Sequence, residues 1–258
     1  MLKQNILSVC LIAFTLVSAQ ESDRILYRVS NEFFPEIHSY SWSIGWRHLR
    51  HKTWKHWWGW EVGLAHIKHP KETRIQPLPA FGDANCLQSV QMRSYVYGKQ
   101  NDFWTVRASI TNSFLLFDAE EESGVSVRFV TNIGLSLGLL KPYYLYVVRI
   151  ESDNSCRVEA VKYDSTIHPL ANPFLDTRYI YGTAGLTGLG ELKIRPGVLV
   201  QASLVFNWAN EPAIRTIEVG ARIEHFLKQV PIMVLIENRA MFPALFLRIT
   251  FGKFKNPS

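Results

Sequence analysis

The sequence predicts an all-β protein, a closed antiparallel transmembrane β-barrel of about twelve strands, with ten or fourteen strands as the alternatives. Three observations support this prediction. The first residues read as a secretory signal, no later stretch is apolar enough for a membrane-spanning helix, and many segments alternate bulky apolar residues with small or polar ones. A chain without such a helix is either a soluble periplasmic protein or a barrel, because only helices and closed barrels satisfy their backbone groups inside a bilayer.

Residues 1–19 have the three parts of a secretory signal. Lys3 supplies the positive charge, residues 6–16 form an apolar run too short to cross a bilayer, and residues 17–19 (Val-Ser-Ala) form a small-residue cleavage site. Cleavage after Ala19 leaves residues 20–258 as one barrel domain. The predicted location is therefore the outer membrane of a Gram-negative cell, reached after signal cleavage.

Composition excludes several other classes of protein. Hydrophobic residues make up 47% of the 258 and charged residues 19%, a balance too apolar for intrinsic disorder. Only three cysteines are present, too few for a small disulfide-stapled scaffold.

The alternation is clearest in two neighbouring segments. Residues 39–46 place Tyr40, Trp42, Ile44 and Trp46 on one face and only Ser and Gly on the other, and residues 58–65 repeat the pattern. A soluble sandwich would carry Lys, Glu and Thr on its outward face. Small residues opposite the bulky ones instead suit the crowded interior of a barrel whose bulky face meets lipid.

Extending this pattern along the chain gives the twelve predicted strands. An even number of strands places both termini on the periplasmic side, where turns are short, and the longer connections outside. The two long connections, 68–89 and 151–178, both fall on the outer side. The strands are 24–33, 38–49, 54–67, 90–98, 103–117, 124–139, 143–150, 179–193, 198–208, 214–226, 231–237 and 244–254.

Two cysteines remain after the signal is removed, and they fall in the two long outer connections. Cys86 and Cys156 would therefore meet in an oxidising compartment, which predicts an intramolecular disulfide, with intermolecular pairing and free thiols as alternatives. The bridge would close a loop of about 70 residues and contribute on the order of 4 kcal/mol.

Charged residues on the inward faces of the predicted strands form the main candidate site. Charges in a narrow lumen are costly unless they are paired. Two interpretations remain open: a self-neutralising network that keeps the barrel shut, or a polar pore that selects small solutes. The predicted lumen network comprises Arg47, Glu61, Arg93, Arg107, Arg128, Arg149, Glu191, Glu218, Arg222, Glu224 and Arg248.

The densest basic and aromatic segment is residues 47–58. Its three histidines lack carboxylates or thiols at ligand spacing, so no metal site is predicted, and an outer-membrane barrel rarely meets nucleic acid. Trp54, Trp57 and Trp58 are predicted to form an aromatic belt at the membrane edge, with lipids as partners. A basic periplasmic rim would then comprise Arg50, Lys52, Lys55, Lys99, Lys141, Arg195 and Lys228.

Catalytic chemistry finds little support in the sequence. A lipid-hydrolysing barrel needs a Ser or Thr nucleophile beside a His base, and the nearest candidates are His38, Ser39 and Ser41. Neighbours in a strand point to opposite faces, so His38 and Ser39 cannot act together. No catalytic residue and no cofactor is predicted, and membrane-embedded lipid hydrolysis stays the least favoured alternative.

Three segments carry a family resemblance: His-Pro-Lys-Glu at 69–72, Tyr-Gly-Lys-Gln-Asn at 97–101, and Gly-Leu-Ser-Leu-Gly-Leu-Leu-Lys-Pro-Tyr-Tyr at 134–144. With these segments the chain resembles a family of Bacteroidota-type outer-membrane β-barrel proteins. The resemblance implies an outer-membrane barrel and carries over no enzymatic activity. It also suggests a non-enzymatic role in the envelope or in a type IX-like secretion machinery, with periplasmic or secretion-complex proteins as partners. The alternative function is a narrow channel for small solutes.

Overall fold

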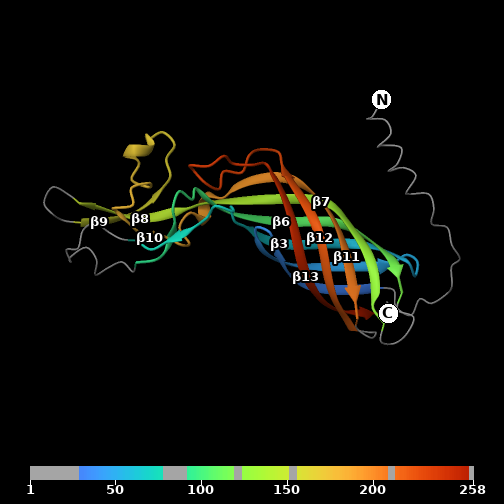
Figure 1. The fold of residues 1–258 in the computed structure, drawn as a ribbon. Helices are drawn as coiled ribbons and strands as arrows, with labels where there is room; N and C mark the ends of the chain where they lie inside the picture. The colour runs from blue at the N-terminus through green and yellow to red at the C-terminus, as the bar shows by residue number, and fades with distance from the viewer. Residues whose placement is uncertain (1–28, 78–91, 119–123, 151–155, 209–212, 256–258) are drawn as a thin grey trace, which may run out of the picture.

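A computed structural model describes residues 29–77, 92–118, 124–150, 156–208 and 213–255. Eight strands close into one antiparallel barrel in the order β1-β13-β12-β11-β7-β6-β3-β2 (Figure 1). Burial alternates along them, as in β13, because every second side chain points into the barrel. The barrel strands are β1 (Val29–His38), β2 (Ser41–His51), β3 (His56–Ile67), β6 (Asn101–Phe117), β7 (Ser126–Pro142), β11 (Lys193–Asn207), β12 (Ala213–Phe226) and β13 (Met241–Lys255).

The prediction of a closed antiparallel barrel is confirmed, but the predicted number of strands is wrong. Four of the twelve predicted strands are not in the barrel wall. Segment 90–98 contributes only β5 (Tyr95–Val96), and segment 143–150 is β8 (Tyr144–Ile150), which pairs outside the barrel. Segment 231–237 forms no strand.

The fourth segment, 179–193, is interrupted by a turn. It contains β10 (Ile180–Thr183) and the short 3-10 helix η2 (Leu189–Glu191). Between them Gly185 and Gly188 have φ values of +51° and +92°, a left-handed backbone that only glycine adopts readily. The glycines therefore end the strand.

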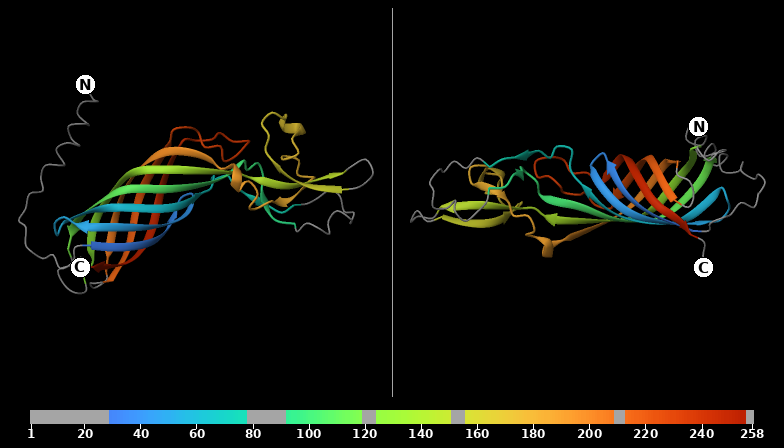
Figure 2. Two further views of the ribbon diagram at one scale, coloured as in Figure 1. Left: turned by 180° about the vertical axis from the view of Figure 1, so that it is seen from behind. Right: turned by 90° about the horizontal axis from the view of Figure 1, so that it is seen from below.

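A second, smaller body projects from one end of the barrel. Strands β10, β8 and β9 (Cys156–Lys162) form a three-stranded sheet, and β4 (Arg74–Ile75) pairs with β5. Its own core is rich in aromatic residues and includes Tyr95, Tyr143 and Phe174. Figures 1 and 2 show this projection at the end of the barrel opposite the one where β1 begins and β13 ends. We call the two ends the loop end and the terminal end.

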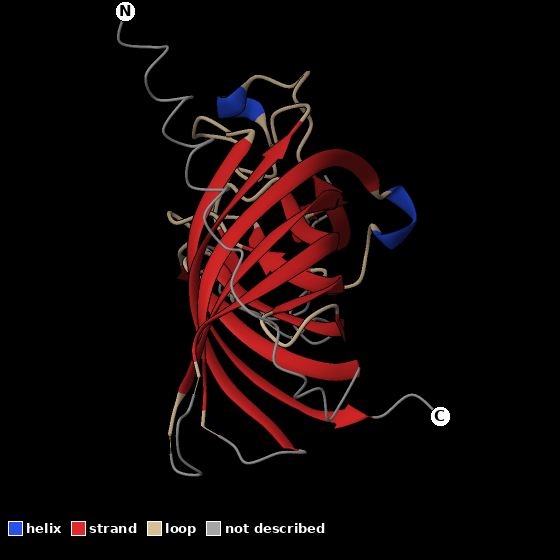
Figure 3. Ribbon diagram, turned by 90° about the vertical axis from the view of Figure 1, so that its right-hand side faces the viewer, coloured by secondary structure: helices blue, strands red, loops and turns tan. Residues whose placement is uncertain are grey.

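Connection lengths differ strongly between the two ends. Residues 52–55, 118–125 and 208–212 connect strands at the terminal end, whereas 39–40, 68–100, 143–192 and 227–240 connect them at the loop end, where all but the first are long. Both predicted long connections thus leave the barrel at one end, as expected. In Figure 3 the two 3-10 turns, η1 (Pro169–Ala171) and η2, lie outside the barrel wall. Within the described residues, no helix is long and apolar enough to cross a bilayer.

The basic rim predicted on one side is divided between the two ends. Strands alternate in direction along the chain, so the direction predicted for a strand depends on how many strands precede it. Each predicted strand that is not a barrel strand therefore reverses the predicted direction of the strands after it. Arg50, Lys52 and Lys55 lie at the terminal end, and Lys99, Lys141, Arg195 and Lys228 lie at the loop end.

Apolar side chains close both ends of the barrel. At the loop end Phe103, Phe226 and Phe242 pack together with residues of the 227–240 connection. At the terminal end the buried cluster comprises Leu49, Trp57, Ile214 and Phe254. The charged interior lies between these two clusters.

Two sequence predictions fall on residues outside the described part of the chain. The signal at residues 1–19 is one, and it stays a prediction. The disulfide is the other, because Cys86 is not described, while Cys156 is the first residue of β9.

Candidate functional site

The barrel interior is filled by an ion-pair network in which the two signs balance. Nine of its ten charged side chains are buried, and the tenth, Arg128, is half-buried. Five arginines therefore accompany five glutamates inside the wall. We call this set the interior network: Glu32, Glu36, Arg47, Glu61, Arg107, Arg128, Glu218, Arg222, Glu224 and Arg248.

Arg248 on β13 lies at the centre of the interior network and is fully buried. Its Nη1 and Nη2 donate to the two oxygens of Glu61, each at 2.9 Å. Its Nη2 also donates to Glu36 at 2.8 Å, and its Nη1 lies 3.3 Å from Glu218. One guanidinium thus bridges carboxylates from β1, β3 and β12, which ties distant parts of the wall together.

Two further arginines complete the contacts of the same carboxylates. Arg222 forms a bidentate pair with Glu36, with both N–O distances at 2.8 Å. Arg47 donates to Glu61 at 2.8 Å and to Glu218 at 2.9 Å. Bidentate, charge-assisted bonds of this kind are among the strongest hydrogen bonds in proteins.

Neutral polar residues use the remaining lone pairs of the carboxylates. Ser203 donates to Glu218 at 2.6 Å, and Ser136 donates to Glu224 at 2.8 Å, where Arg107 also binds. A buried charge is tolerated only when its hydrogen-bonding capacity is used in this way. The small inward residues read from the sequence therefore serve as hydrogen-bond partners as well as space savers.

Aromatic rings fill the space between the charges. The Arg248 guanidinium lies 3.6 Å from the centroid of the Phe34 ring, and Arg222 lies 4.8 Å from that of Phe246. Gly45 makes room for Phe34, because a Cβ at position 45 would lie 2.3 Å from the ring. At the terminal end Arg128 sits 3.2 Å above Trp57. Ion pairs and rings together occupy the interior.

Of the eleven residues predicted for the lumen, eight belong to the interior network. The other three, Arg93, Arg149 and Glu191, are corrections, because the segments that carry them do not form barrel strands. Arg149 is exposed on β8, and exposed Glu191 in η2 pairs with Lys162. Arg93 lies in the projection, where its backbone N–H donates to Tyr181.

Sequence reasoning missed Glu32 and Glu36. The first strand was predicted at 24–33, and this boundary left Glu36 in a turn, whereas β1 spans Val29–His38 and points both glutamates inward. The balance of charges among the predicted inward residues could have revealed the two missing glutamates. The eight correctly predicted residues include five arginines and only three glutamates, so two acidic partners were missing.

The outer surface of the barrel is apolar over several neighbouring strands. Ile133, Leu135 and Leu245 are each more than 60% exposed. Neighbouring outward positions on β3, β11 and β12 are also apolar and exposed. Water-soluble monomers rarely expose a continuous apolar surface of this extent.

Tryptophans lie on this surface at two heights along the barrel axis. Trp58 and Trp60 point outward near the terminal end of β3, and Trp42 packs edge-on against Trp104 near the loop end. His66, which stacks on Trp104, is eight residues from Trp58. Eight residues at about 3.3 Å each, tilted by roughly 40°, give about 20 Å along the barrel axis. This separation suits girdles flanking an apolar band of about 25 Å.

The three tryptophans predicted as a belt take different positions. Trp58 is on the outer surface, whereas Trp57 is 5% exposed inside the barrel, stacked 4.0 Å from His51. Trp54 is half-buried in the turn, with Lys55 Nζ 4.7 Å from its ring. Consecutive residues of a strand face opposite sides, so Trp57 and Trp58 could not share one belt.

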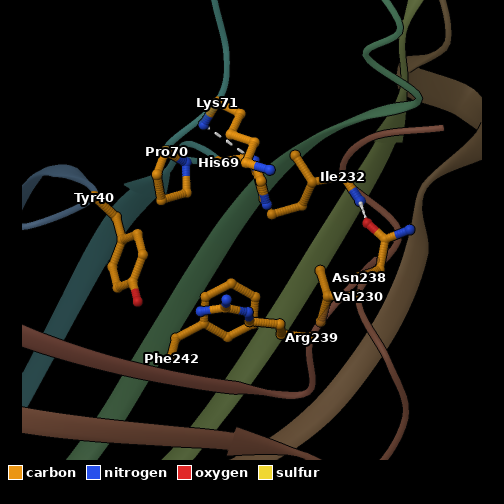
Figure 4. Close-up of a pocket in the computed structure, with 9 residues that line it drawn as sticks. All are labelled: Tyr40, His69, Pro70, Lys71, Val230, Ile232, Asn238, Arg239 and Phe242. Atoms are coloured by element: carbon orange, nitrogen blue, oxygen red, sulfur yellow. Dashed lines mark hydrogen bonds between the residues drawn. The ribbon is translucent and has the colours of Figure 1, made fainter. Parts of the chain in front are cut away.

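A small cavity lies at the loop end, between the β1–β2 turn and the 68–72 and 227–240 segments (Figure 4). Its volume is about 90 Å³, far below the several hundred Å³ of typical small-molecule sites. Burial lowers the pKa of its His69, and nearby Arg239 and Lys71 act in the same direction against Glu72. The Asn238 side chain is committed to backbone groups of Ile232 and Met233.

Of the candidates for catalysis, His38 and Ser39 point to opposite sides of the barrel wall, whereas Ser41 is the register partner of His38 across the β1–β2 turn. His38 is buried inside the barrel, where its Nδ1 accepts a hydrogen bond from the Tyr40 N–H. Ser39 is exposed and bonds to the Leu245 backbone. Among the described residues, no group of three His, Cys, Asp or Glu side chains is placed to hold a metal ion.

Comparisons with known proteins give only a loose likeness. No family model matches the chain, and no curated protein does. Neisserial surface protein A is similar at 10% identity and a TM-score of 0.37, covering 89% of this chain and 97% of its own. Ail, the attachment invasion locus protein of Yersinia pestis, is similar at 8% identity and a TM-score of 0.32, covering 88% and 96%.

Proposed function

We propose that this protein is an integral outer-membrane β-barrel that acts without catalysis. It anchors the projection formed by β4, β5, β8, β9 and β10 at the cell surface. The observation that carries the proposal is the inverted distribution of polarity, with ten charged groups inside the barrel wall and apolar side chains outside it. A lipid bilayer stabilises this arrangement, whereas water does not.

The connection lengths give the orientation. Outer-membrane barrels have short periplasmic turns and long outer loops. The terminal end, with its short connections, therefore faces the periplasm, and the loop end with the projection faces outward. Service to a secretion assembly, which the family resemblance implies, would then use the projection or the periplasmic turns as its contact surface.

The interior favours an anchor over a channel. Arg47, Arg248, Glu36 and Glu218 are all at most 2% exposed, and apolar clusters close both ends. An ion would have to separate several bidentate pairs to pass, and each broken buried pair costs about 3–5 kcal/mol. The same four residues are engaged with one another, so they offer no free lining to a solute.

Two measurements on the purified, refolded protein test the proposal. It should float with phosphatidylcholine vesicles in a density gradient and resist extraction by alkaline carbonate. In planar bilayers it should show no steady conductance. Failure to insert would refute the membrane location, whereas regular open-channel steps would refute the sealed interior and favour the narrow channel.

A further inference from the structure

The outer surface at the terminal end carries a group of exposed cations on one side of the barrel. Arg50 on β2 and Lys253 and Lys255 on β13 are exposed and point outward. Strand β1 runs between them, paired with both neighbours. None of the three forms an ion pair with a carboxylate of the described residues.

The strand register aligns these cations in rows. Val29 on β1 is paired with Lys255 on one side and with Arg50 on the other. In the next row Asn31 lies between Lys253 and His48, and its Oδ1 is 2.8 Å from His48 Nδ1. With strands about 4.8 Å apart, β13 and β2 are separated by about 10 Å, within the combined reach of a lysine and an arginine side chain.

In the row nearer the barrel middle, the residues on β13, β1 and β2 are all apolar. Phe33 on β1 is flanked by Phe251 on β13 and Trp46 on β2, and all three are 44–50% exposed. Two shallow hollows lie on this face, one over β1 between β13 and β2 and the other over β2 and β3. One is lined by residues that include Trp46, Phe251 and Lys253, and the other includes Arg50 and Trp58.

Among the described residues, the opposite side of the barrel has no such cations at the terminal end. At the terminal end, the outward residues of β6, β7 and β11 are uncharged, as Phe114, Phe129 and Leu204 illustrate. Arg215 on β12, paired with Phe251, adds a further outward cation on the basic side. A general headgroup belt would surround the barrel, so the asymmetry indicates a localised site.

We propose that this face binds one anionic phospholipid, whose phosphate lies between Arg50, Lys253 and Lys255 and whose acyl chains lie along Phe33, Trp46 and Phe251. The inference rests on the proposed membrane location. Positive side chains at a bilayer surface attract anionic headgroups, and tryptophans such as Trp58 position themselves at the same level. Charge complementarity and the adjoining apolar row together match the two halves of a phospholipid.

Native mass spectrometry of the detergent-solubilised protein tests the site. Phosphatidylglycerol and phosphatidylcholine with identical acyl chains are titrated against the wild type and a variant with Arg50→Gln, Lys253→Gln and Lys255→Gln. The wild type should bind one phosphatidylglycerol at least about tenfold more tightly than phosphatidylcholine, and the variant should lose this preference. Replacing two exposed loop-end cations, Lys68→Gln with Lys228→Gln, should leave it unchanged.

Each contrary result has a distinct meaning. Equal affinity for the two lipids, or a preference retained in the triple variant, would overturn the proposal. Complete displacement of the lipid by excess inorganic phosphate would overturn the lipid source in favour of a plain anion site. Flotation with phosphatidylcholine vesicles is measured on the same samples. A protein that floats without lipid preference refutes only this site, whereas one that does not float refutes the membrane location.

Discussion

Replacing Arg248 by methionine tests the interior network at its most connected member. The change Arg248→Met removes the hydrogen bonds to Glu36, Glu61 and Glu218 and leaves the interior with a net charge of about −1. The three carboxylates keep part of their environment. Glu36 remains bound to Arg222, while the other two carboxylates remain bound to their second arginine.

The expected loss in the free energy of unfolding comes from the hydrogen bonds that no other group replaces. A hydrogen bond to a charged group contributes about 1.5–3 kcal/mol, and removing one partner of a buried ion pair costs about 3–5 kcal/mol. Two uncompensated bonds of the five would give about 3–6 kcal/mol. We therefore expect Arg248→Met to lower the free energy of unfolding by about 4 kcal/mol.

Urea unfolding in phospholipid vesicles, followed by tryptophan fluorescence, measures this change. The matched control is Arg178→Met in the projection, where the arginine is paired with Asp176 but 67% exposed. An exposed pair contributes about 1 kcal/mol or less, so the control should change little. Adding Glu61→Gln to Arg248→Met should cost less than the sum of the two single changes, because it removes the excess negative charge that the first change leaves in the interior. A loss below about 1 kcal/mol for Arg248→Met would refute the reasoning.

Two further outcomes follow from single side chains. Gly45→Ala should lower the free energy of unfolding by about 1–3 kcal/mol, measured by the same urea titration, because the new Cβ would lie 2.3 Å from the Phe34 ring; wild-type stability in this variant would contradict the packing. At the loop end burial lowers the pKa of Lys99, but Asp102 and Glu72 outweigh it and hold that pKa above its usual value. A raised pKa stabilises the fold below the unfolded value of about 10.4 and loses that effect as pH rises through the folded pKa. The stability difference between wild type and Lys99→Met should thus stay constant up to about pH 10 and shrink above it, and a difference that grows with pH would contradict the ion pairs.

The sequence was sufficient to predict the closed barrel because period two reports which face of a strand is apolar. It was insufficient to count the strands, because the same period occurs in β8, which pairs within the projection. Periodicity gives the faces of a strand but not its partner, and pairing is set by contacts distant in the chain. The predicted strand 179–193 shows the same limit, because left-handed Gly185 and Gly188 turn the backbone within it.

The predicted site was correct where the predicted strands were correct. Residues on correctly placed strands, such as Arg47 and Arg222, were predicted to face inward and do so. Glu36 was missed because a strand boundary was wrong by five residues at its C-terminal end. The specific pairs depend on the barrel bringing β1, β3, β12 and β13 around one guanidinium, and no spacing along the chain contains that information.

The most direct test of the central claim is a depth measurement at alternate positions of two strands. Single cysteines are introduced into a background carrying Cys86→Ser and Cys156→Ser, labelled with a fluorophore, and quenched by lipids brominated on their acyl chains. Leu245→Cys and Leu135→Cys should be strongly quenched, because both side chains point out of the barrel. Ser136→Cys should be protected or unreactive, because its side chain is buried inside the barrel. Quenching that alternates with period two is the predicted result, and equal quenching at neighbouring positions, or none at any, would contradict a lipid-coated barrel with a charged interior.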